Sequence, residues 1–124
     1  MASPAADRTV LVVEDDAALR AFYVRALRMA GFPTAATEDG LDALRWIEQH
    51  RPALIVLDLT LVRVSGRDVQ RELRAHDDTR NVPVLVVTGD DTSDLNASEL
   101  VCILRKPVTA DALIDAVTQG LRGP

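Results

Sequence analysis

The stretch "VLVVEDDAAL", residues 10–19, joins four consecutive aliphatic side chains directly to three acids. A run of aliphatic residues belongs inside a protein, where a carboxylate without a partner is costly. Glu14, Asp15 and Asp16 therefore need a reason to follow a buried segment. If the run is a strand of an open parallel sheet, the acids lie at its carboxyl end, where such sheets bind ligands.

Similar aliphatic runs recur along the chain and alternate with segments of helical spacing. Three of the runs show no alternation of polar and apolar residues, which is typical of strands covered on both faces. Between the runs, apolar residues recur at the helical period, most clearly in residues 19–30. This order predicts an α/β fold with a doubly wound, five-stranded parallel sheet. The expected strands are residues 9–13, 34–36, 54–57, 84–87 and 101–104.

The bulk composition indicates one soluble domain. The chain has 124 residues, a net charge of −5 and 48% hydrophobic residues. The negative charge argues against direct binding of nucleic acid, and no apolar stretch is long enough for membrane insertion. A single cysteine, Cys102, fits a reducing cytoplasm and is expected to be a small buried core residue. We expect a disordered N-terminal tail over residues 1–8 and one domain over residues 9–122.

Chemically reactive side chains follow four of the predicted strands. Glu14 and Asp15 follow the first, Asp58 the third, Thr88 the fourth and Lys106 the fifth. The carboxyl ends of parallel strands meet at one edge, so these side chains should converge there. Three clustered carboxylates suit Mg²⁺, and a lysine and a hydroxyl suit phosphoryl oxygens. Asp58 is then a candidate nucleophile that forms an aspartyl-phosphate.

Four short motifs carry a resemblance to a known family. In this order, and each at a strand end, they resemble the response-regulator receiver domains of two-component signalling over nearly the whole chain. The resemblance implies a flavodoxin-like (βα)5 receiver fold. The motifs are "VVEDD" at residues 12–16, "IVLDL" at 55–59, "VVTG" at 86–89 and "LRKP" at 104–107.

The resemblance also implies a role for each site residue. The domain would be a phosphoacceptor rather than an enzyme, with at most self-phosphorylation from small donors and slow autodephosphorylation. Its donor would be a histidine kinase or a histidine phosphotransfer protein. Asp15 would bind Mg²⁺ directly and Glu14 indirectly, and Asp58 and the backbone carbonyl of Thr60 would complete the ligand set. Asp58 would be phosphorylated. Thr88 and Lys106 would contact the phosphoryl oxygens.

Further expectations concern structure and output. Members of the family often have a cis peptide bond before the proline, so the bond between Lys106 and Pro107 is a candidate, and Gly66 matches the glycine that opens the third helix. With no output domain following, we expect protein–protein contact or onward phosphotransfer by a monomer or weak homodimer. Whether the chain stands alone or comes from a longer protein is left open.

The chain departs from the family pattern on the surface by which family members usually signal to their targets. Val62 replaces a common proline, and Ile103 replaces the usual aromatic residue. The connection before the fifth strand is about one helical turn shorter than usual. Its residues 90–100 favour caps and turns, so a helix there would have one or two turns at most. We therefore expect phosphorylation to change the order of this acidic, solvated loop.

Alternative interpretations remain open. The chain could be a receiver-like scaffold that binds partners without being phosphorylated. "LDLTL", residues 57–61, resembles the nucleophile motif of haloacid-dehalogenase-type phosphatases, although Thr60 stands where that family has a second acid. A flavodoxin-like nucleotide site is less favoured because no glycine-rich or hydroxyl-rich loop follows the first strand. Asp16 could be a further ligand but is expected to cap the first helix.

Overall fold

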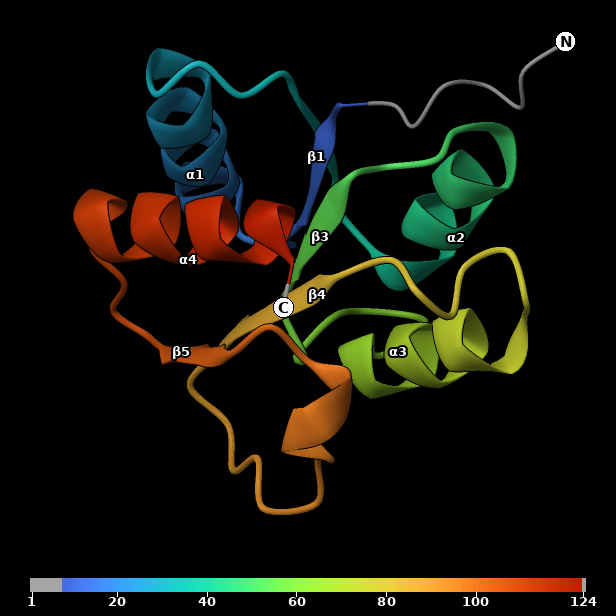
Figure 1. The fold of residues 1–124 in the computed structure, drawn as a ribbon. Coiled ribbons are helices and arrows are strands. Elements are labelled where there is room, and N and C mark those ends of the chain that lie inside the picture. The colour runs from blue at the N-terminus through green and yellow to red at the C-terminus, as the bar shows by residue number, and fades with distance from the viewer. Residues whose placement is uncertain (1–7, 124) are drawn as a thin grey trace, which may run out of the picture.

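Five parallel strands form one sheet in the computed structural model, which describes residues 8–123 (Figure 1). The strands are β1 (Val10–Val13), β2 (Thr34–Thr37), β3 (Leu54–Leu57), β4 (Val84–Thr88) and β5 (Ile103–Arg105). Their order is β2-β1-β3-β4-β5, and every pairing is parallel. The order changes direction at β1, as in doubly wound sheets. The predicted fold class is confirmed.

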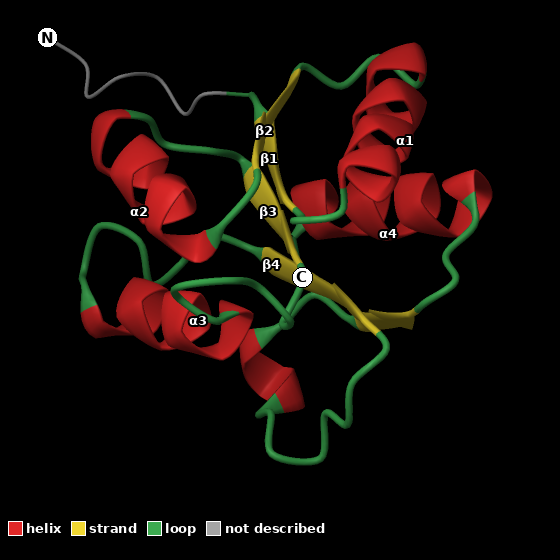
Figure 2. Ribbon diagram, turned by 180° about the vertical axis from the view of Figure 1, so that it is seen from behind, coloured by secondary structure: helices red, strands yellow, loops and turns green. Residues whose placement is uncertain are grey.

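Helices cover both faces of the sheet (Figure 2). On one face lie α1 (Ala17–Met29) and α4 (Ala110–Arg122), and on the other lie α2 (Gly40–Gln49) and α3 (Gly66–Ala75). The helices of each pair contact one another. Each face therefore has its own aliphatic core between the sheet and two helices.

The strand residues alternate between these two cores. In β1, Leu11 and Val13 pack in the core that contains Ile47 of α2, whereas Val12 packs in the core that contains Leu27 of α1. All four residues of β1 are buried. Because successive side chains point to opposite faces and both faces are covered, every position of a central strand favours an apolar residue.

The fourth connection differs from the expected (βα)5 pattern. Between β4 and β5 the chain forms one short 3₁₀ turn, η1 (Ala97–Glu99), and no α-helix. Asn96 caps this turn, and Asp91 accepts a hydrogen bond from the backbone of Ser93. Short polar side chains that bond the nearby backbone compete with a helix, which explains the loss of the fourth helix. The expectation of at most two turns is confirmed.

Two smaller expectations have different outcomes. Asp16 caps α1, since its side chain accepts a hydrogen bond from the backbone N–H of Leu19 at 3.0 Å. Cys102 is only partly buried, because it precedes the edge strand β5 and packs at the margin of the core. The expectation of a buried core residue is therefore met only in part. Of the predicted tail, residues 1–7 lie outside the described part of the chain.

The first residue of α3 approaches the backbone of the β3 end closely. A Cβ atom at Gly66 would lie 2.1 Å from the carbonyl oxygen of Asp58 and 2.5 Å from Cα of Leu59. The backbone N–H of Gly66 also donates to the carbonyl of Leu59 at 3.0 Å. Only glycine allows this approach, so Gly66 fixes the entry of α3 beside the residue that follows β3.

We predict that Gly66→Ala lowers the free energy of unfolding by about 2–3 kcal/mol, because the new methyl group meets backbone atoms that cannot rotate away. Gly89→Ala is the matched control, since a Cβ atom there has nothing within 4 Å. It should change stability by less than about 0.5 kcal/mol. Urea unfolding with unchanged m-values measures both. Equal stability of the two variants would contradict the assigned contact.

Candidate functional site

The predicted site residues converge at the carboxyl edge of the sheet. Glu14 and Asp58 directly follow β1 and β3, and these two strands are paired in register. Thr88 is the last residue of β4, and its carbonyl accepts a hydrogen bond from the backbone N–H of Lys106 at 3.1 Å. Parallel pairing thus brings four separate segments of the chain to one place.

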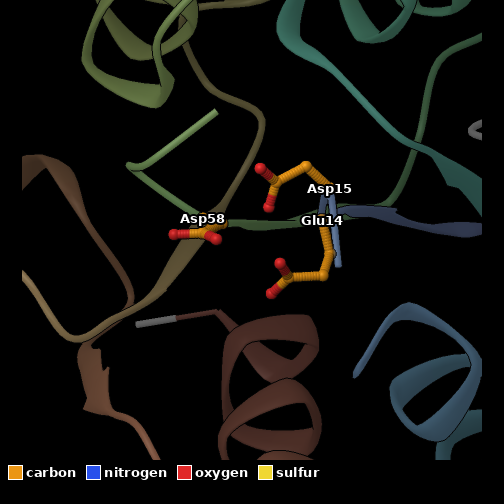
Figure 3. A group of neighbouring side chains, drawn as sticks. All are labelled: Glu14, Asp15 and Asp58. Atoms are coloured by element: carbon orange, nitrogen blue, oxygen red, sulfur yellow. The ribbon is translucent and has the colours of Figure 1, made fainter. Parts of the chain in front are cut away.

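Three carboxylates form a cluster at this edge (Figure 3). One oxygen from each of Glu14, Asp15 and Asp58 lies within 4.8 Å of the others. Glu14 and Asp58 are buried, whereas Asp15 is exposed. Oxygen ligands at this spacing, with one side open to water, suit a hard divalent cation such as Mg²⁺.

The ammonium group of Lys106 lies between the two buried acids. Its Nζ is 2.9 Å from Oε1 of Glu14 and 3.0 Å from Oδ2 of Asp58. The peptide bond between Lys106 and Pro107 is cis, as predicted. Since buried charges need partners, one lysine here partly neutralises two carboxylates.

Burial and charge shift the proton affinities of this group. Burial raises the pKa of Glu14 to about 7 and repulsion by Asp58 adds to the increase, while hydrogen bonds from Lys106 and from the backbone of Asp16 oppose it. For Lys106, burial lowers the pKa, but its hydrogen bonds to Glu14 and Asp58 outweigh burial and raise the pKa above its usual value. Lys106 is therefore held as a cation beside the two acids.

Backbone contacts orient the acids. The N–H of Thr60 donates to Oδ1 of Asp58 at 3.0 Å, so both oxygens of Asp58 have a partner. Arg20, which the sequence analysis missed, donates from Nη1 to the carbonyl oxygens of Glu14 at 3.0 Å and Asp15 at 3.3 Å. No spacing rule points to Arg20, because its contacts depend on how α1 leaves β1.

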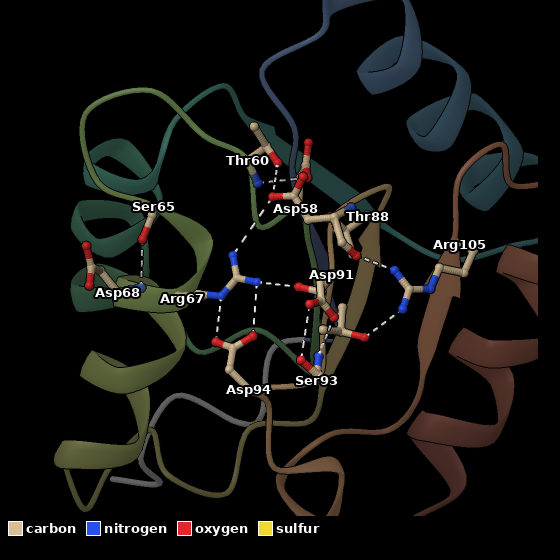
Figure 4. A network of polar contacts seen from close by, with 12 residues as sticks. Asp58, Thr60, Ser65, Arg67, Asp68, Thr88, Asp91, Ser93, Asp94 and Arg105 are labelled. Atoms are coloured by element: carbon tan, nitrogen blue, oxygen red, sulfur yellow. Dashed lines mark hydrogen bonds and ion pairs between the residues drawn. The ribbon is translucent and has the colours of Figure 1, made fainter.

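The acidic connection between β4 and β5 is tied to the rest of the molecule (Figure 4). Arg67 of α3 donates from Nε to Asp94 at 2.8 Å, and Arg105 donates to the hydroxyl of Thr92 at 2.8 Å. The hydroxyl of Thr60 donates to Asp90 at 2.7 Å. The acids of this loop are exposed, as expected of a solvated loop, and they also pair with side chains from segments that are distant in sequence.

Asp90 also contacts the end of β4. Its backbone N–H donates to the hydroxyl oxygen of Thr88 at 3.1 Å. The metal-type cluster found in residues 8–123 contains neither Asp90 nor the other acids of this connection. The connection is thus joined to the site through Thr60 and Thr88, not as part of the carboxylate cluster.

The sequence matches a known family over most of its length. The family model of the response regulator receiver domain matches residues 10–118. The polar-differentiation response regulator DivK of Brucella anthropi is 29% identical over 114 residues, which are 89% of this chain and 93% of DivK. The response regulator MprA of Mycobacterium sp. strain KMS is 39% identical over 83 residues, 67% of this chain but only 35% of MprA. The chain thus matches about a third of that relative's length.

Solved structures have the same fold. The signal receiver domain of a protein described as a Luxo repressor, from Vibrio parahaemolyticus, superposes with a TM-score of 0.83 at 32% identity, covering 93% of this chain and 90% of that one. The chemotaxis protein CheY4 of Vibrio cholerae has a TM-score of 0.82 at 22% identity, covering 91% of this chain and 98% of that one, and supports the fold alone.

The described residues contain no helix that is long and apolar enough to cross a membrane. The sheet order, the carboxylate cluster with its lysine, and a family match that spans residues 10–118 all agree. The chain belongs to the family of response regulator receiver domains of two-component signalling.

Proposed function

We propose that this receiver domain is a phosphorylatable signalling switch. Asp58 accepts a phosphoryl group from the phosphohistidine of a histidine kinase or a histidine phosphotransfer protein. The observation that carries the proposal is the position of Lys106, whose Nζ lies 3.0 Å from Asp58 beside the carboxylate cluster. A fixed cation next to a candidate nucleophile and a divalent-ion site is the arrangement that phosphoryl transfer requires.

The proposed reaction exchanges one bond for another. A carboxylate oxygen of Asp58 attacks the phosphorus, the P–N bond of the donor breaks, and its electron pair stays on the imidazole nitrogen. The product on this chain is an acyl phosphate. Lys106 neutralises charge on the phosphoryl oxygens, and the hydroxyl of Thr88, whose oxygen already accepts a hydrogen bond from the backbone N–H of Asp90, donates a hydrogen bond to one of them.

The acids are proposed to bind Mg²⁺, which when bound neutralises charge on the phosphoryl oxygens. Asp15 is assigned as the direct ligand because it is the exposed member of the cluster. Glu14 is buried and already hydrogen-bonded to Lys106, which favours contact through water. Asp58 and the backbone carbonyl of Thr60 complete the proposed ligand set.

The remaining assignments follow from the same proposal. The domain spans residues 9–122 and acts in the cytoplasm as a monomer or weak homodimer. It passes the signal on by protein–protein contact or onward phosphotransfer. As a phosphoacceptor it has at most self-phosphorylation from small donors and slow autodephosphorylation.

The response is proposed to run through residues 89–100. Ile103 stands at the usual aromatic position and packs partly buried against the core under α2 and α3, so no ring is present to rotate. Thr60 and Thr88 flank the phosphoacceptor, and both contact Asp90. Movement of either hydroxyl toward a phosphoryl group would therefore change the contacts of this connection.

We predict that Asp58→Asn abolishes phosphorylation by a small phosphodonor such as acetyl phosphate with Mg²⁺, because the amide is not a nucleophile. Intact-mass spectrometry measures the adduct. Asp90→Asn is the matched control and should still be phosphorylated, since its carboxylate contacts Thr60 rather than the cluster. An adduct that persists in Asp58→Asn, or that forms equally well in excess chelator, contradicts the proposal.

We predict that Asp15→Asn weakens Mg²⁺ binding at least about tenfold, because it removes the exposed charged ligand. Isothermal titration calorimetry measures the affinity. Asp16→Asn is the neighbouring control, since Asp16 caps α1 and lies outside the cluster. It should bind Mg²⁺ as the original chain does. Unchanged affinity in Asp15→Asn would remove this residue from the ligand set.

We predict that Glu14 makes the metal-free protein less stable as the pH rises from about 4.5 to about 7. The pKa of Glu14 is higher in the folded state than in the unfolded state, so over this range the folded state binds a proton that the unfolded state has released. The free energy of unfolding therefore falls as the pH rises toward the folded-state pKa. The stability of Glu14→Gln relative to the original chain should therefore rise over that range. Urea unfolding in chelator measures it, with the exposed Glu48→Gln as control. Parallel pH profiles for the original chain and Glu14→Gln would show that burial does not perturb Glu14.

A further inference from the structure

A groove of about 330 Å³ runs between α3 and the connection that replaces the fourth helix. We call residues 90–100 of this connection the strap. Both sides of the groove carry charge: the α3 side presents arginines, and the strap presents acids. No residue of the carboxylate cluster lines the groove, although the strap belongs to the connection through which the response is proposed to run.

Three ion pairs join the strap to α3, and the acids of two of them, Asp94 and Glu99, line the groove. Arg67 donates from Nε to Asp94 at 2.8 Å, and Nε of Arg74 lies 3.9 Å from a carboxylate oxygen of Glu99. The two arginines are seven residues apart, which places them on the same face of the helix. Between about a quarter and a little over half of each side chain is exposed, so equivalent external acids can replace these pairs at little cost.

A leucine follows each of the two paired acids. Leu95 comes directly after Asp94, and Leu100 comes directly after Glu99. Both leucines line the groove and pack, partly buried, against the core under α2 and α3. The strap thus presents two acid–leucine pairs, each with an ionic and an apolar contact to the α3 face.

The strap leaves the buried side-chain amide of Gln70 without a hydrogen-bond partner. Gln70 of α3 lines the groove and is only 7% exposed. Neither the oxygen nor the nitrogen of its side-chain amide has a hydrogen bond among the described residues. A buried amide without partners is costly, so the groove is better suited to an occupant that supplies both a donor and an acceptor.

We propose that this groove binds an acidic, leucine-containing peptide segment of a partner protein in place of the strap. Acids of the partner would pair with Arg67 and Arg74, its leucines would replace those of the strap, and its backbone would bond the amide of Gln70. The strap is then an internal competitor with the same pattern of acids and leucines as the partner. Peptide backbone carries the donor and the acceptor that Gln70 lacks.

The groove has a route to the phosphoacceptor, and this part of the inference rests on the proposed function. Thr60 donates from its backbone to Asp58 at 3.0 Å and from its hydroxyl to Asp90 of the strap at 2.7 Å. Asp90 also lies 3.9 Å from Arg67. Phosphorylation of Asp58 would disturb these contacts, loosen the strap and open the groove to the partner.

The test uses a labelled peptide that copies residues 90–100, "DDTSDLNASEL", added to the whole chain and followed by fluorescence anisotropy. Asp94→Asn combined with Glu99→Gln weakens the internal competitor and should increase peptide affinity about tenfold. Arg67→Gln combined with Arg74→Gln should abolish binding. A peptide in which the residues equivalent to Asp94 and Glu99 are changed to asparagine and glutamine should not bind.

Gln70→Leu separates binding from folding. Replacing an unpartnered buried amide by an apolar group should leave the free energy of unfolding unchanged or higher, whereas peptide affinity should fall about tenfold with the lost hydrogen bonds. Gln49→Leu, on the exposed end of α2, is the matched control and should alter neither. If Gln70→Leu binds as Gln49→Leu does, or if weakening the strap does not improve binding, the groove is not the site.

The link to Asp58 is tested separately, by adding beryllofluoride with Mg²⁺ as a phosphoryl mimic. Peptide affinity should increase in the original chain and stay constant in Asp58→Asn. Because peptide binding is first measured without the mimic, failure to bind contradicts the groove itself. A peptide that binds equally with and without the mimic contradicts the link to Asp58.

Discussion

The ammonium of Lys106 lies within 3.0 Å of two buried carboxylates, and the carboxyl edge of the sheet depends on this contact. Without it, Glu14 and Asp58 would be buried close together with no counter-charge, which is strongly unfavourable. Parallel pairing brings the three residues together, and the bond from the backbone of Lys106 to Thr88 holds the lysine beside the end of β4. The same contact that makes burial of the acids tolerable also sets a cation beside the candidate phosphoacceptor.

Two parts of the molecule differ in how they are held. The acids and Thr88 of the site lie at the ends of the buried strands β1, β3 and β4, and the side chains of Glu14 and Asp58 are both bonded to Lys106. The strap is held by exposed ion pairs, one capped 3₁₀ turn and two partly buried leucines. Exposed pairs contribute little stability, so the strap belongs to the part of the fold that opens most easily. The chemistry is therefore fixed while the surface beside it can change.

Thr60 connects these two parts. Its backbone bonds the phosphoacceptor and its hydroxyl bonds Asp90, so one residue contacts both the site and the strap. A helix in the fourth connection would satisfy its own backbone and would not need these side-chain partners. Where that helix is missing, Arg67 of α3 donates to the backbone carbonyl of Asp91, and Arg105 of β5 donates to that of Asp90. In this chain, a signal can leave the site through polar contacts rather than through the position of an aromatic ring.

The sequence by itself determined the α/β class, the first four strands to within one residue, the cap at Asp16 and the residues at the strand ends, because these features depend on hydrophobic period and local hydrogen bonding. The fifth strand was predicted at residues 101–104 but lies at Ile103–Arg105. The sequence also showed that residues 90–100 disfavour a helix. The tertiary structure alone decided the partners of the acids in that segment, the role of Arg20 and the unpartnered amide of Gln70. These contacts join side chains that are distant in sequence, and no spacing rule specifies which face of α3 meets which residue of a loop. Long-range pairing depends on how the elements pack, and packing is set by the whole chain.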